Sequence, residues 1–154
     1  MRAITFIALM SILHLPLSAT ADAPQRMHGL WEISVAEAGA PTRSFHICVG
    51  AGDEMFAQVD PQAGDCSPAS WGRDAHYRYV AQNCSGPGGE IVRSGRFAGD
   101  FQYNYQGELR QRVVGADTDR TLEIEGRRLA PCKRLKPGEF VVKGHNGVNL
   151  NLGQ

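Results

Sequence analysis

Side chains alternate between apolar and polar along much of the second half of this 154-residue chain, and no other feature limits its fold as strongly. The longest run starts at Phe101 and ends at Arg110. Its apolar members are Phe101, Tyr103, Tyr105 and Leu109. A period of two is typical of a strand with one buried and one exposed face, and such strands pair in antiparallel sheets. The run therefore predicts a mainly β protein.

Four further segments, residues 30–35, 43–49, 75–81 and 121–125, show the same alternation. The residues that it predicts to share the inward faces are Trp31, Ile33, Val35, Phe45, Ile47, Val49, Ala75, Tyr77, Tyr79, Ala81, Leu122 and Ile124. Residues 91–97 predict one more strand, broken by its glycine at position 95.

Glycine, proline and aspartate separate the predicted strands. Ser85–Gly89 predicts a turn, because these residue types favour turn backbone. Asp53 is suited to cap a short helix, which would carry Met55, Phe56 and Val59. We therefore expect a curved antiparallel sheet or partly closed barrel of about six to eight strands, with one short helix.

Residues 1–21 predict a secretory signal peptide. Arg2 supplies a positive start, and an apolar stretch follows from Ile4 to Leu17. Ala19 and Ala21 are small residues at the two positions that a signal peptidase reads. The apolar stretch is too short to remain in a bilayer. We expect cleavage after Ala21, a periplasmic or secreted location, and no integral membrane segment after cleavage.

All four cysteines follow this segment, at Cys48, Cys66, Cys84 and Cys132. An even number in an exported chain predicts two disulfides in an oxidising compartment. A zinc site is disfavoured, because its cysteines are typically spaced two to four residues apart and these are not.

Two pairings of the cysteines follow from their positions. Cys66 and Cys84 flank a predicted hairpin, which favours a bond between them. Cys48 and Cys132 would then connect an early strand to the last one. The alternative joins Cys48 to Cys66 and Cys84 to Cys132.

The composition changes after Cys132, where the chain becomes basic and is interrupted by proline. We therefore divide the mature chain into a disulfide-linked β domain, residues 22–132, and a C-terminal extension, residues 133–154. The extension is either a hairpin that turns at Asn146-Gly147 or a flexible tail.

Several short motifs follow one another in a characteristic order. They are Gly29–Ile33, Cys48–Val49, Cys66 before a hairpin, Cys84–Gly89, Gly99–Tyr103 and Gly126–Cys132. Over residues 28–132 their order and spacing resemble domain of unknown function family 3617, a group of exported bacterial proteins. The resemblance implies a periplasmic setting and a disulfide-linked β domain, and it implies no activity and no catalytic residues. The chain departs from the family pattern after Cys132, where members commonly end.

No motif for catalysis, cofactor or metal binding stands out in the sequence. Gly86–Gly89 leads into a strand, so it lacks the helix N-terminus of a phosphate-binding loop. Asp117 and Asp119 lack the further ligands of a calcium loop. The mature histidines, His28, His46, His76 and His145, have no metal-site spacing. Equal numbers of basic and acidic residues, 16 of each, argue against a nucleic-acid partner.

Aromatic residues are numerous in the predicted strands and offer a candidate ligand face. Its members are Trp31, Tyr77, Tyr79, Phe101, Tyr103 and Tyr105. Core packing is one explanation for them. The other is an open concave face that binds an apolar or glycan-like ligand through large, rigid rings.

The sequence thus predicts a non-enzymatic binding or envelope-associated protein whose partner is a small apolar or glycan ligand, or an envelope protein. A protein-binding inhibitor of an envelope hydrolase is the alternative, with Gly86–Gly89 inserted into a cleft. A hydrolase that uses scattered carboxylates is a third hypothesis.

Overall fold

The computed structural model describes residues 22–51, 55–56, 59–60, 63–116, 119–143 and 149–151. Its strands are β1 (Gly29–Glu37), β2 (Arg43–Val49), β3 (Asp65–Cys66), β4 (Ser70–Arg73), β5 (Arg78–Gly86), β6 (Gly89–Gly99), β7 (Asn104–Val113), β8 (Asp119–Ala130), β9 (Phe140–Lys143) and β10 (Asn149–Asn151). The eight strands β1–β8 lie within the predicted β domain, and the last two belong to the C-terminal extension.

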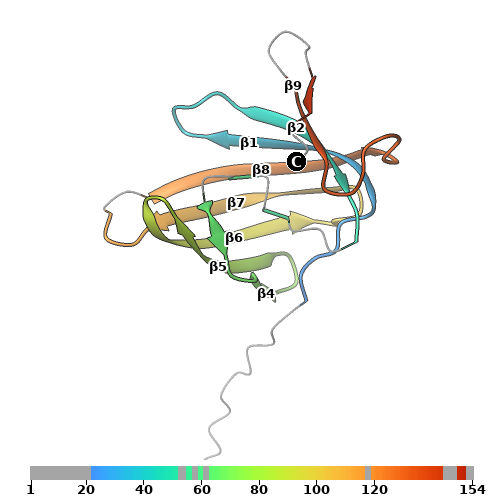
Figure 1. Cartoon of the computed structure of the whole chain (residues 1–154). Helices are drawn as coiled ribbons and strands as arrows, with labels where there is room; N and C mark the ends of the chain where they lie inside the picture. The colour runs from blue at the N-terminus through green and yellow to red at the C-terminus, as the bar shows by residue number, and fades with distance from the viewer. Residues whose placement is uncertain are drawn as a thin grey trace, which may run out of the picture.

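All strands belong to one antiparallel sheet with the order β10-β9-β2-β1-β8-β7-β6-β5-β3, and β4 also pairs with β5. Figure 1 shows this sheet curling around its concave side into a half-barrel. The expected mainly β fold with a curved antiparallel sheet is therefore confirmed. No helix in the described part of the chain is long and apolar enough to cross a membrane.

The concave side of the sheet holds the hydrophobic core. β1 contributes Trp31, Ile33 and Val35, each at most 2% exposed. The predicted inward residues of β2 and β8 are also buried: Phe45, Ile47, Val49, Leu122 and Ile124. Clean alternation of β-branched and aromatic residues with polar ones thus identified the inward face of these three strands correctly.

The predicted inward face of β5 is wrong. Val80 is the residue that points into the core, at 4% exposed, whereas Tyr77 and Tyr79 are 40% and 42% exposed. The strand also starts at Arg78 rather than at Ala75. Tyrosine tolerates either side of a sheet, since its ring is apolar and its hydroxyl is polar, so alternation of tyrosines does not fix the face.

β6 and β7 also depart from expectation. β6 runs through Gly95 without a break and pairs with β7 from Ile91 to Gly99. β7 begins at Asn104, because the chain turns at Phe101 with a φ of 55°. The Asp100 carboxylate fixes this turn by accepting the backbone N–H groups of three following residues. These hydrogen bonds lower the pKa of Asp100.

Two inward-facing glycines let aromatic rings lie flat across the curled sheet. A Cβ at Gly126 would overlap the ring of Tyr105, its cross-strand partner. A Cβ at Gly107 would lie 2.5 Å from the ring of its partner Phe97. Both rings are buried, so these glycines shape the core through lack of side-chain volume.

The described residues of the expected helix form turns instead. Met55, Phe56 and Val59 are in turns and are buried, and Asp53 lies outside the described residues. Their burial against the concave face, rather than helical periodicity, positions this segment.

Two disulfides link strands of the sheet to one another and to the chain that follows it. Cys66 and Cys84 are bonded and directly opposite one another on β3 and β5. Cys48, on β2, is bonded to Cys132, just after β8. The favoured pairing is therefore confirmed, and the alternative pairing is wrong.

The C-terminal extension adds to the sheet. β9 pairs with β2 along Phe45–Ile47, and β10 pairs with β9. The predicted turn at Asn146-Gly147 and the predicted signal peptide lie outside the described residues.

Candidate ligand cavity

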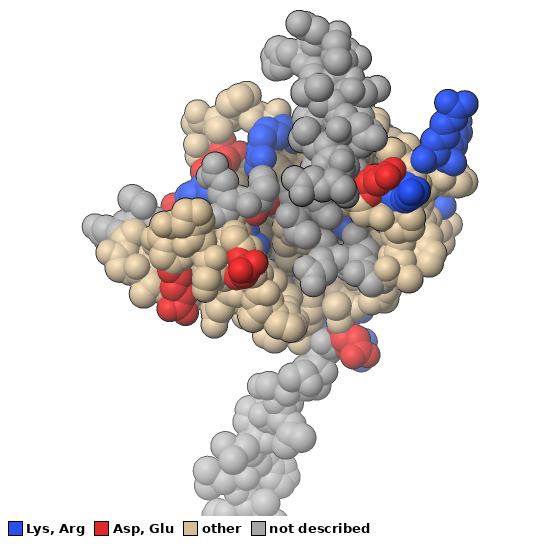
Figure 2. All heavy atoms as spheres, in the orientation of Figure 1, with Lys and Arg blue, Asp and Glu red and all other residues tan. Residues whose placement is uncertain are grey.

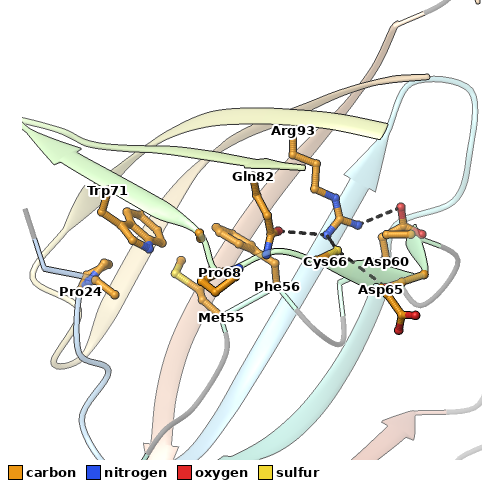
Figure 3. Close-up of a pocket in the computed structure, with 14 residues that line it drawn as sticks. Pro24, Met55, Phe56, Asp60, Asp65, Cys66, Pro68, Trp71, Gln82 and Arg93 are labelled. Atoms are coloured by element: carbon orange, nitrogen blue, oxygen red, sulfur yellow. Dashed lines mark hydrogen bonds and ion pairs between the residues drawn. The ribbon is translucent and has the colours of Figure 1, made fainter. Parts of the chain in front are cut away.

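A cavity of about 440 Å³ lies between the concave side of β5 and β6 and the segment that connects β2 to β4. Its described lining residues are Ala23, Pro24, Met55, Phe56, Asp60, Ala63, Gly64, Asp65, Cys66, Pro68, Ala69, Trp71, Gln82 and Arg93. Volumes of about 300–1,000 Å³ are typical of small-molecule sites. Figure 3 shows that the lining is divided, with aromatic and aliphatic side chains at one end and charged and amide groups at the other.

The apolar end is built from aromatic rings held by the core. Phe56 stacks on Trp71 with ring centroids 5.8 Å apart and an interplanar angle of 17°. Phe56 also contacts Phe97 of β6, at 5.3 Å between centroids. Met55 and Pro24 lie beside Trp71 in Figure 3. These rings form a preorganised apolar wall, because their other sides are packed into the protein.

The polar end centres on Arg93 of β6, which is only 2% exposed. One of its terminal nitrogens is 3.3 Å from the Asp60 carboxylate. The other donates to the Gln82 side-chain oxygen, at 3.5 Å, and lies equally far from the Cys66 sulfur. Burial lowers the pKa of Arg93, and the neighbouring Asp60 charge acts in the opposite direction. Arginine nonetheless stays protonated in proteins, so the cavity contains a fixed cation.

Arg93 belongs to a polar row that crosses four strands on the concave side. Cross-strand pairing places Gln82, Arg93, Gln111 and Arg120 side by side on β5 to β8. Gln111 is buried, at 4% exposed. Two buried nitrogens of the described residues have no hydrogen-bond partner, Nε of Arg93 and Nε2 of Gln111. Buried donors without acceptors are rare in folded proteins.

Two carboxylates balance the charges of this row. Arg120 donates two hydrogen bonds to Glu37 of β1, at 2.8 and 2.7 Å, which lower the pKa of Glu37 and raise that of Arg120. Arg120 also lies 3.8 Å from Asp60. The cluster of Arg93, Arg120, Asp60 and Glu37 thus carries equal numbers of positive and negative charges.

The six aromatic residues of the predicted ligand face do not share one face. Trp31, Phe101 and Tyr105 are buried in the core, and Phe101 stacks on Tyr105. Tyr77, Tyr79 and Tyr103 are exposed. The structure therefore brings three of the six together as packing residues, and none of the six lines the cavity described above.

Tyr77 and Tyr79 form a small exposed cluster. Their ring centroids are 6.3 Å apart, and the Arg96 guanidinium lies 5.6 Å from the Tyr77 centroid. The Tyr79 hydroxyl donates to Asp74 at 2.6 Å. That hydrogen bond raises the pKa of Tyr79, so the hydroxyl is protonated at neutral pH.

Metal-binding groups do not gather in the described part of the chain. No three histidine, cysteine or acidic side chains there are placed to hold a metal ion. His46 is 3.4 Å from Glu32, outside the cavity. The carboxyl groups with a resolved pKa shift, Glu37, Asp74 and Asp100, are all shifted downward, which does not suit a general acid.

The polar end of the cavity was not predicted from the sequence, although the sequence contains a signal for it. Arg93 and Gln111 fall in the inward phase of their strands, at positions where apolar residues are expected. A buried polar residue of this kind marks either a structural network or a binding site. Asp60 carried no such signal, because its position depends on how the connecting segment folds back.

Comparison with known proteins adds no relative. No family model, no curated protein and no solved structure matches the chain. The function of the cavity therefore has to be inferred from its lining residues and their contacts.

Proposed function

We propose that this protein binds a small, largely apolar molecule in the cavity beside Arg93, without catalysing a reaction. The observation that carries the proposal is the divided lining of a cavity of about 440 Å³, with stacked rings at one end and a buried ion pair at the other. A fixed polar group that orients a mostly apolar ligand is typical of small-molecule sites.

We further propose that the protein works outside the cytoplasm. The two disulfides are compatible with an extracellular or periplasmic location. The predicted signal peptide and the resemblance to an exported family support the same location. A binding protein of this size would there carry or sequester a poorly soluble molecule. Insertion of the Gly86–Gly89 turn into a hydrolase remains the alternative prediction.

Charge on the face shown in Figure 2 favours a neutral or apolar ligand over a charged polymer. Figure 2 shows acidic and basic side chains interspersed on the face that it presents, without a continuous field of one sign. Long-range attraction of a polyanion needs such a field. The ligand is therefore expected to be recognised inside the cavity.

Filling the cavity tests the proposal. Ala69 is partly buried and lines the cavity, so Ala69→Phe would occupy ligand space. We expect the dissociation constant for phenylnaphthylamine, measured by its fluorescence in titrations of the oxidised protein, to rise at least about tenfold. Ala81→Phe is the matched control, since Ala81 is exposed on the opposite side of the neighbouring strand. Equal affinity in both variants, or no binding by the unmodified protein, would reject the cavity as the site.

A further inference from the structure

We propose that the ligand carries a neutral hydrogen-bond acceptor, such as a ketone, ester or amide oxygen, and that this oxygen binds at the Arg93 end of the cavity. The inference rests on the proposed function, because it specifies the chemistry of a ligand in the same cavity. It excludes carboxylates, phosphates and amines as the group at the polar end.

Buried hydrogen-bond donors outnumber their acceptors at the Arg93 end of the cavity. Arg93 uses its two terminal nitrogens for Asp60 and Gln82, while its Nε–H has no acceptor among the described residues. Its cross-strand neighbour Gln111 has an unpartnered amide nitrogen as well. Both side chains are at least nine-tenths buried, and Arg93 lines the cavity. A ligand acceptor that reaches Nε of Arg93 would remove that part of the deficit.

Charged side chains already occupy this end of the cavity. The described lining residues include one cation, Arg93, and two carboxylates, Asp60 and Asp65. Arg93 is paired with Asp60 at 3.3 Å, and Arg120 adds a second contact to that carboxylate. An anionic ligand group would bring a third negative charge next to Asp60 and Asp65. A cationic group would compete with Arg93 for Asp60. A neutral oxygen is not repelled by the carboxylates and does not compete with Arg93 for Asp60.

Apolar and polar side chains lie at opposite ends of the cavity. Figure 3 places Trp71, Met55 and Pro24 at the end away from Arg93, with Gln82 and Phe56 between. A ligand that fills the cavity therefore presents an apolar ring or chain to Trp71 and a single polar group to Arg93. This arrangement fits a molecule with one acceptor at its end.

A series of four probes with one ring system tests the inference. The probes are methyl naphthyl ketone, ethylnaphthalene, naphthoate and naphthylmethylammonium, each titrated into the oxidised protein and followed by NMR. We expect the ketone to bind about tenfold more tightly than ethylnaphthalene, and more tightly than either ion, as one hydrogen bond to a charged donor predicts. The ketone alone should shift the Arg93 Nε–H resonance strongly.

The outcomes separate this inference from the proposed function. Binding of ethylnaphthalene equal to that of the ketone, or tighter binding of either ion, would overturn the neutral acceptor and leave the cavity as a binding site. Failure of all four probes to bind would overturn both proposals. These measurements need no variant, so they stand even where a substitution disturbs folding.

A conservative substitution adds a second readout. Arg93→Lys keeps a positive charge near Asp60 and removes the Nε–H, so the preference for the ketone over ethylnaphthalene should fall to about one. Arg112→Lys is the matched control, because Arg112 lies on the neighbouring strand with its side chain 66% exposed. An unchanged preference in Arg93→Lys would contradict the role given to this nitrogen.

Discussion

Asp74 shows how a single carboxylate can organise an exposed turn. It accepts the backbone N–H groups of His76 and Tyr77, both at 2.7 Å, and the hydroxyl of Tyr79. The Tyr79 hydrogen bond and the two backbone bonds lower the pKa of Asp74 from 3.8 to about 2. The carboxylate thereby fixes the connection between β4 and β5, next to the exposed tyrosine cluster.

This shift predicts a specific pH dependence of stability. The folded-state pKa of Asp74 lies below the ordinary value of 3.8, so its contribution is complete above that value and is lost as the pH falls toward about 2. We expect Asp74→Asn to lower the melting temperature at neutral pH and the difference from the unmodified protein to shrink between about pH 4 and pH 2.

The matched control for Asp74→Asn is Asp22→Asn, which replaces an exposed carboxylate before the first strand. Its melting temperature should stay near that of the unmodified protein throughout the same pH range, as followed by circular dichroism. A constant difference between Asp74→Asn and the unmodified protein down to pH 2 would contradict the assigned pKa.

Single residues also explain why the candidate site was only partly visible in the sequence. Arg93 and Gln111 interrupt the apolar phase of β6 and β7, and this signal is local. Their lack of hydrogen-bond partners is not local, because it depends on the position of Asp60 and on the neighbouring strands. The chemistry of the cavity therefore required the structure.

At the scale of elements, alternation predicted the inward face of a strand correctly where one face was apolar and the other was polar. In β1 and β8 the buried residues Ile33 and Ile124 are each next to glutamate in the sequence. Only one face of each strand is therefore apolar enough to point into the core. β5 carries Tyr79 on one side and Val80 on the other, and both residues are apolar enough to face the core. Packing against β4 and β6 decided in favour of Val80.

In the curled sheet, the inward-facing glycines of the neighbouring strands β7 and β8 leave space for the rings of Phe97 and Tyr105. Gly126→Ala would place a methyl group against the Tyr105 ring, and the surrounding strands leave little room for it. We expect this substitution to lower the free energy of unfolding by about 1–3 kcal/mol, as overpacking typically does. Urea denaturation measures the loss.

Gly88→Ala provides the comparison for this prediction. Gly88 lies in the turn between β5 and β6, and an added Cβ meets nothing within 4 Å. We expect its free energy of unfolding to stay within about 0.5 kcal/mol of the original, as for most surface substitutions. Equal losses in the two variants would show that the sheet can adjust at Gly126.

At the scale of the whole molecule, the two disulfides restrain very different lengths of chain. The bond between Cys48 and Cys132 spans 84 residues, and the bond between Cys66 and Cys84 spans 18. In the chain-entropy model these loops correspond to about 4.5 and about 3 kcal/mol of stabilisation. The longer bond also fastens the end of the β domain to β2.

Replacing each bonded pair of cysteines by alanine tests which disulfide contributes more to stability. The Cys48→Ala/Cys132→Ala variant should lose more free energy of unfolding than Cys66→Ala/Cys84→Ala, by about 1–2 kcal/mol. Chemical denaturation of both variants under identical oxidising conditions gives the comparison. A larger loss in the second variant would mean that the bond between β3 and β5 holds the cavity segment in place as well as restricting the unfolded chain.

The strand order of the half-barrel also determines which strands lie at its two edges, where another chain could pair. One border is divided between β3 and β4, which are two and four residues long and both pair with β5. The other ends in β10, with three residues. Among the described residues, a foreign strand meets only these short edge segments, which disfavour the edge-to-edge pairing that leads to domain swapping and fibril growth.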